Sequence, residues 1–235
     1  MPMLSRSTLA LVTALCVVTG VAAQEADTRH LAPGFHTRPA GSTLLIVPAE
    51  MELFSISAGG VEEPKADWTE AAQRNFRTAL SARREKLGSK VLELSDADVD
   101  EFAEIHALHR AVAEAVFMHH SRSSRKLPTK QDRLDWSLGE AVRPLKARTG
   151  ADYALFTWIR DSYASGERKA TMFALALLGA VNVGGSQTGY ASLVDLQTGR
   201  IVWFNDLDRM TGDLRDQASA AETVDTLLKD FPEVR

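Results

Sequence analysis

The residues best suited to chemistry include two histidines, His106 and His109, which lie three positions apart in a segment with helical periodicity. Both imidazoles would therefore project from one side of a helix, where they could share a metal ion. The neighbouring sequence offers no third ligand at a recognisable spacing, and His109 falls on the apolar stripe of the same segment. We expect no metal and no cofactor here, and we predict that His109 is a partly buried packing residue.

Two glutamates form the second candidate pair. Glu50 and Glu52 would project from one face of a strand, as a general acid and base would need. Two carboxylates on a solvated strand face explain the pair equally well. The turn at residues 57–60 contains two glycines, but no Lys-Ser or Lys-Thr follows it as a phosphate loop requires. No Gly-X-Ser-X-Gly motif occurs either, so we expect a protein that is not an enzyme.

The first 23 residues have the composition of a secretory signal peptide. Arg6 gives a short positive region, residues 9–18 are apolar, and small residues precede Gln24. The apolar part is shorter than the roughly 20 residues that a spanning helix needs. We predict cleavage after Ala23 and a periplasmic or secreted protein.

The single cysteine, Cys16, lies inside the apolar part of this signal. Leu15 precedes it, where lipoprotein processing prefers a small residue, so we do not expect lipidation. A mature chain that begins at Gln24 has no thiol, which excludes disulfides and cysteine catalysis. The formal net charge of −4 is mild and gives no indication of nucleic-acid binding.

The mature chain is predicted to contain one α/β domain, residues 43–235, after a flexible lead-in at residues 24–42 that is rich in Pro and Gly. Residues 44–47 form a continuous apolar run, typical of a central strand with both faces covered. Around Pro48 we expect a bent strand or two strands.

Helical and strand patterns alternate along the rest of the domain. Further strands are predicted at residues 90–94, 153–159, 190–196 and 201–205, and helices at 67–87, 98–120, 134–149 and 214–231. Asp67 and Glu70 would form a capping box, and Pro144 would kink its helix or break it into two pieces. The predicted fold class is α/β (α+β): a mixed sheet of about four to five strands, helices packed mainly on one face, a closing β-hairpin and a C-terminal helix.

Residues 172–183 form an unusual apolar segment, Met-Phe-Ala-Leu-Ala-Leu-Leu-Gly-Ala-Val-Asn-Val. It is too short to span a bilayer and too apolar for an exposed helix. Three interpretations stay open: a buried helix, which we favour, a membrane contact or an oligomer contact. In the last two cases the contacting side chains would be Phe173, Leu175, Leu177 and Leu178.

Two segments in the last third of the chain resemble a superfamily of bacterial envelope proteins. They are residues 149–155, Thr-Gly-Ala-Asp-Tyr-Ala-Leu, and residues 192–203, Ser-Leu-Val-Asp-Leu-Gln-Thr-Gly-Arg-Ile-Val-Trp. The superfamily includes the curli-secretion component CsgG, the penicillin-binding-protein activator LpoB and the amino-terminal domain of TolB. In its members a helix leads through a Gly-Ala-Asp-like step into a strand. A later hairpin has an Asp, a Thr-Gly turn and an apolar strand that ends in Trp.

The resemblance implies a mixed α/β domain with helices against one face and a binding or assembly role in the envelope. Its implied partners are an envelope protein or a second copy of the chain. Members at the outer membrane are commonly lipid-anchored through a cysteine at the mature start, which Gln24 does not provide. Outer-membrane association would then depend on a partner or on residues 172–183, without spanning. The alternative function is an exported metal-binding protein or enzyme that uses His106 and His109.

Overall fold

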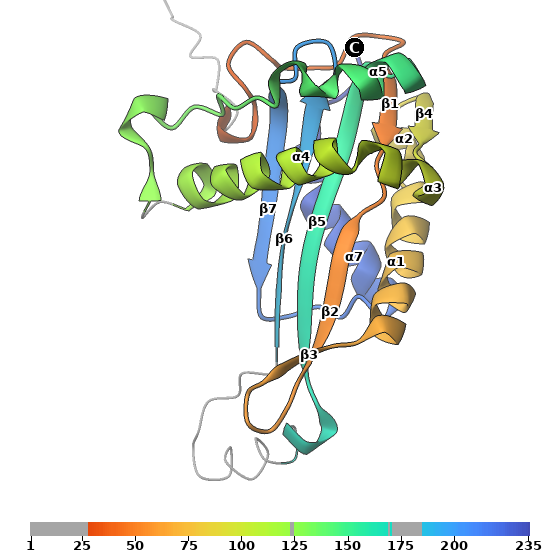
Figure 1. The fold of residues 1–235 in the computed structure, drawn as a ribbon, viewed down its shortest axis with the longest axis vertical. Coiled ribbons are helices and arrows are strands. Elements are labelled where there is room, and N and C mark those ends of the chain that lie inside the picture. Colours follow the sequence, from red (N-terminus) through yellow and green to blue (C-terminus); the bar gives the residue numbers. More distant parts are fainter. Residues whose placement is uncertain (1–27, 123–124, 169, 171–184) are drawn as a thin grey trace, which may run out of the picture.

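A computed structural model describes residues 28–122, 125–168, 170 and 185–235 (Figure 1). The predicted signal peptide and the apolar segment 172–183 lie outside these described residues. The strands are β1 (Thr43–Ile46), β2 (Glu50–Ile56), β3 (Glu62–Pro64), β4 (Lys90–Glu93), β5 (Tyr153–Ala164), β6 (Gly185–Asp195) and β7 (Ile201–Arg209). The main helices are α1 (Ala66–Ser81), α2 (Arg84–Leu87), α3 (Asp96–Val99), α4 (Ala103–Val116), α5 (Arg143–Thr149) and α7 (Gln217–Leu227).

One mixed sheet of seven strands organises the described residues. Along one edge of β5, β1 and β2 follow each other in parallel, and along the other edge β6 runs antiparallel and pairs with β7. Outside them, β4 pairs in parallel with β1, and β3 pairs antiparallel with β2. β1 and β2 lie end to end at one position of the sheet, which we call the β1/β2 lane, and β4 and β3 lie end to end outside it in the same way. The sheet is therefore five strands wide. The α/β class, the mixed sheet, the closing hairpin and the C-terminal helix are confirmed.

Helices cover both faces of the sheet, so the prediction that they pack mainly on one face is wrong (Figure 1). The chain crosses from the β1/β2 lane outward to β4 through α1, and then back from β4 to β5 through α4. Right-handed crossovers that run in opposite directions place their helices on opposite faces. Periodicity gives each helix an apolar stripe, but it does not say which face the stripe will meet.

Each face therefore has its own core. On the first, α1 and α7 pack with Phe76, Val224 and other buried side chains against the odd-numbered residues of β5, such as Leu155. On the second, α4 and α5 cover the even-numbered residues, such as Phe156, with Ile105 among the packing side chains. Burial of each such large apolar side chain contributes about 1.5–3 kcal/mol.

The described part of the predicted lead-in, residues 28–42, packs against the domain. Ala32 N donates to Val202 O at 2.9 Å and His30 Nδ1 donates to Phe204 O at 2.9 Å, which covers part of the outer edge of β7. Arg38 is fully buried, with Nε 3.1 Å from Pro232 O. An edge strand presents unpaired backbone groups, and this segment satisfies some of them.

Several helix boundaries differ from the predicted ones. Lys65 is the N-cap of α1 and makes no side-chain cap bond, so the predicted capping box does not form. Residues 134–138 are not helical, and the rest of the predicted helix is divided into a 3-10 helix at Gly139–Val142 and α5, with Pro144 in the first turn of α5. The predicted break into two pieces therefore occurs next to Pro144. Proline at that position costs no helical hydrogen bond. Gly150 ends α5 in the left-handed conformation.

The closing hairpin is held by a docked turn. Gly199 has φ +72° and its N–H donates to Asp195 O at 2.8 Å. Its own carbonyl accepts from Leu138 N at 2.8 Å, and Ile201 N donates to Trp136 O at 2.9 Å. A Cβ on Gly199 would lie 2.0 Å from the carbonyl oxygen of Gly139. The turn thus needs glycine for both its conformation and this close approach.

Gly199→Ala is expected to destabilise the protein by about 2 kcal/mol or more, since strain at positive φ adds to a backbone clash. Gly150→Ala is the matched control, because its φ is +69° and no atom lies within 4 Å of the added carbon. It should cost only about 1 kcal/mol. Urea denaturation measures both variants, and equal losses would contradict the docked turn.

Candidate functional site

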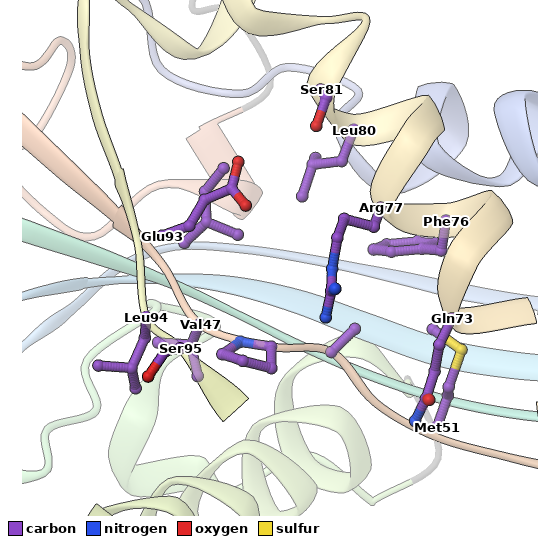
Figure 2. Close-up of a pocket in the computed structure, with 13 residues that line it drawn as sticks. Val47, Met51, Gln73, Phe76, Arg77, Leu80, Ser81, Glu93, Leu94 and Ser95 are labelled. Carbon is purple, nitrogen blue, oxygen red and sulfur yellow. The ribbon is translucent and has the colours of Figure 1, made fainter. Parts of the chain in front are cut away.

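The candidate site begins with a hollow of about 560 Å³ beside the junction of β1 and β2 (Figure 2). It lies at the carboxyl ends of β1 and β4, where α/β sheets commonly bind ligands, and its volume falls in the range of ligand pockets. Its walls come from the strand junction, from α1 and from the end of β4. They comprise Ile46, Val47, Pro48, Ala49, Met51, Gln73, Phe76, Arg77, Leu80, Ser81, Glu93, Leu94 and Ser95.

An extra residue in the strand lane creates the junction. Ile46 pairs with Leu155 and Glu50 pairs with Trp158. The chain therefore advances four residues from Ile46 to Glu50, while β5 advances only three residues from Leu155 to Trp158. Pro48 lies between them and has no N–H to give to a neighbouring strand. The predicted break around Pro48 is confirmed, with the surplus residue accommodated as in a β-bulge.

The hollow combines an apolar wall with a charged rim. Phe76 and Leu80 of α1 are buried along its wall. Arg77 extends from α1 towards the strand junction, and Glu93 stands on the other side, at the end of β4 (Figure 2). An apolar surface with a few polar groups around it is typical of sites that bind ligands or peptides.

A second hollow, of about 370 Å³, continues the first on the α4 side of the junction. The two share Pro48, Ala49 and Gln73. The second also includes Glu50, Asp100, His106 and Arg110 among its lining residues. We call the two together the kink groove. The structure thus brings two predicted site residues, Glu50 and His106, to one hollow.

His109 is a packing residue, as predicted. It is 5% exposed and its ring stacks on Phe156 with a centroid distance of 4.1 Å. Nε2 is 2.6 Å from Ser192 Oγ, and burial lowers the pKa of His109 to about 3. Ser192 is fully buried as well, so substrate cannot reach this pair as it would reach a nucleophile and its base.

His106 also contacts Phe156, in an edge-to-face arrangement with a centroid distance of 5.7 Å. Burial lowers its pKa, and its Nε2 has no hydrogen-bond partner among the described residues. The same part of the chain contains no group of three or more His, Cys, Asp or Glu that could hold a metal ion. The nearby ligands that a shared site needs are therefore not assembled around these two rings.

Glu50 and Glu52 are engaged in ion pairs at the surface. Glu50 Oε1 is 3.0 Å from Arg110 Nη1 and 3.1 Å from Arg160 Nη2, and Glu52 Oε2 is 3.5 Å from Arg160 Nε. The two carboxylates are 38% and 42% exposed. This arrangement fits the solvated-face interpretation, in which such pairs contribute at most about 1 kcal/mol.

Residues 57–60 form the turn between β2 and β3, as predicted. Gly60 N donates to Ser57 O at 2.9 Å, and Val61 N donates to Ser57 Oγ at 3.0 Å. The turn therefore uses its own polar groups locally, as turns of this composition do.

A buried polar network at the end of β5 was not predicted from the sequence. Residues 161–169 look like a polar connection, yet β5 continues to Ala164. Asp161 is 2% exposed and accepts hydrogen bonds from the Tyr163 hydroxyl and, at 2.7 Å, from Gln187 Nε2. Burial raises the pKa of Asp161 to about 6. The alternation of Ile159, Asp161 and Tyr163 was the available signal, because all three share one face.

The groove residues on α1 were also missed. Gln73 and Arg77 look like ordinary exposed helix positions in the sequence, and only the break at Pro48 indicated an irregular strand nearby. A hollow between a helix and a strand end depends on how those elements pack, which periodicity does not specify.

Acidification should destabilise the fold through His109. Its pKa is below the unfolded value, so the unfolded state binds more protons and stability is lost as pH falls below about 6.5. The slope should reach up to about 1.4 kcal/mol per pH unit for this group. His109→Gln should reduce the slope measured by urea denaturation between about pH 7.5 and about pH 4.5.

His36→Gln is the control, because His36 is exposed and should leave the slope unchanged. An unchanged slope in His109→Gln would contradict the assignment of the acid sensitivity to His109.

No protein-family model matches the sequence, and no curated protein matches it. The fold is similar to the PelC dodecamer structure from Paraburkholderia phytofirmans, with 13% identity, a TM-score of 0.38 and coverage of 86% of this chain and 95% of that one. It is similar to the LpoB C-terminal domain from Salmonella enterica, with 14% identity, a TM-score of 0.30 and coverage of 77% and 88%. Lipoprotein GNA1162 from Neisseria meningitidis has 12% identity, a TM-score of 0.31 and coverage of 78% and 90%. Identities this low do not assign the chain to a family.

Proposed function

We propose that this chain is an exported, envelope-associated accessory protein that binds a partner protein in the kink groove and catalyses no reaction. The observation that carries the proposal is the groove itself. It is a two-part hollow with an apolar wall and a charged rim, at the carboxyl ends of β1 and β4. Concave surfaces of this composition bind partners or ligands more often than flat polar surfaces do.

The groups that would support catalysis are already engaged. Glu50 and Glu52 are paired with arginines, and His109 is neutral and covered by Phe156. A general base must reach the proton that it removes, and a buried imidazole bonded to Ser192 cannot. The alternative of a metal-binding protein or enzyme that uses His106 and His109 therefore has less support than partner binding.

Export rests on the signal-like residues 1–23, and retention at the envelope needs a further contact. Within the described residues, no helix is both long and apolar enough to cross a bilayer. We propose that the partner held in the groove keeps the protein at the envelope, with the apolar segment 172–183 as the other candidate contact.

Protein recovered from a periplasmic extract is expected to begin at Gln24. Intact-mass spectrometry checks this, and Ala23→Leu, which removes the small residue before the cleavage point, should leave the longer precursor. A full-length mass for the wild-type chain in that extract would contradict cleavage.

A photoreactive residue in the groove should capture the partner in intact cells. Gln73 and Ser81 are exposed positions of α1 that line the groove, and both should give a discrete adduct. Thr78 is the matched control, since it is an exposed position of the same helix outside the groove lining. Adducts that are equally strong at Thr78, or absent at both groove positions, would overturn the proposal. An adduct with a second copy of the chain would identify the partner as the protein itself.

A further inference from the structure

We infer that the occupant of the kink groove is an extended segment of the partner polypeptide that pairs with an open stretch of the β2 edge at Met51. The inference rests on the proposed function and adds how the partner is held. Strand addition of this kind uses main-chain hydrogen bonds for affinity and side-chain pockets for specificity.

The outer edge of β2 is occupied at both ends and open between them. Before β2, the last hydrogen bond from the β4 segment is the one that Leu94 N donates to Ile46 O, at 2.9 Å. At the far end of the same edge, β3 pairs with β2 from Phe54 onwards. Next to β3, Leu53 N donates to Thr69 Oγ1 at 3.0 Å and Leu53 O accepts from Lys65 N at 2.8 Å. The backbone of Leu53 therefore faces away from β5 and is satisfied there.

Met51 lies two residues before Leu53 in an uninterrupted register with β5. In a strand, residues of the same parity direct their backbone groups to the same side, so the N–H and C=O of Met51 also face outward. Outside the sheet ladder, no backbone group of the described residues bonds to either group. Buried backbone groups are nearly always paired, and Met51 is only 6% exposed. An added strand would supply the missing partners.

The two hollows match the alternation of such a strand. One lies on the α1 side of the strand junction and the other on the α4 side. Successive side chains of a strand point to opposite faces, so adjacent residues of the added segment would enter one hollow each. The α1 side, with Phe76 and Leu80, fits an apolar side chain.

The α4 side fits a basic side chain. Its charged lining residues are Glu50, Asp100 and Arg110, and Arg110 is already paired with Glu50. Arg160 also pairs with Glu50, so Asp100 is the carboxylate of this lining that lies outside that ion-pair cluster and could pair with an incoming cation. The expected partner segment is extended and carries an apolar residue next to a Lys or Arg, a pattern that gives both shape and charge complementarity.

Two substitutions at one position separate backbone pairing from side-chain contact. Met51→Pro removes the outward N–H, while the bonds to β5 are made by its neighbours and remain. Met51→Ala shortens the same side chain and keeps the N–H. With the photoreactive residue at Ser81, Met51→Pro should lower the adduct yield about fivefold or more relative to Met51→Ala. Circular dichroism and thermal melts establish that both variants fold.

A second variant keeps the inference testable where Met51→Pro fails to fold. Asp100→Lys replaces the carboxylate that would pair with the basic side chain, at an exposed position of the α4-side hollow, and should lower the adduct yield about fivefold or more. Glu101→Lys is the control, because Glu101 is the exposed neighbour outside the groove lining and should leave the yield unchanged.

The outcomes separate the two proposals. No adduct at Gln73 or Ser81 in the wild-type chain would overturn partner binding in the groove and strand addition with it. A wild-type adduct that persists in both Met51→Pro and Asp100→Lys would overturn strand addition alone. Retention of a small molecule by the purified wild-type protein, with no adduct, would also overturn both and identify a different ligand class.

Discussion

The central strand β5 has both edges paired and both faces covered, and the other elements are arranged around it. Its twelve residues extend past the end of β1, so a second strand, β2, must continue the same parallel lane. The two crossovers that build this lane and its neighbour run in opposite directions, which requires a helix layer on each face. Covering both faces lets the chain build two cores against one strand.

The groove is a consequence of that same lane. Between the Ile46–Leu155 pair and the Glu50–Trp158 pair, the β1/β2 lane contains one more residue than β5. This surplus bends the chain, ends the pairing with β4 and leaves Met51 at an edge that α1 does not fully close. A strand that could be paired throughout would have had no such opening, so the irregularity that interrupts the sheet also creates the hollow.

Buried polar groups act on the fold in opposite directions as pH changes. His109 is neutral in the folded protein because burial lowers its pKa. The free energy of unfolding therefore falls as pH drops below the pKa that His109 has in the unfolded chain. Asp161 has a raised pKa, so its contribution is present at low pH and is lost as pH rises through about 6. Each lies under a different helix layer, since His109 belongs to α4 on one face and Asp161 faces the α1 and α7 side. The hydrogen bonds of His109 and Asp161 are directional, so they define the position of the neighbouring elements on the sheet more narrowly than apolar packing alone would.

The sequence by itself determined the elements that local patterns specify. The apolar run at residues 44–47, the break at Pro48, the left-handed stop at Gly150 and the hairpin turn at Gly199 were all predictable, because each depends on the chemistry of nearby residues. Tertiary structure alone decided the rest. It placed α4 opposite α1, buried Arg38 under the C-terminal segment and assembled Gln73 and Met51 into one groove. Those outcomes depend on crossover direction and on contacts between residues far apart in the chain, and neither leaves a periodic signal in the sequence.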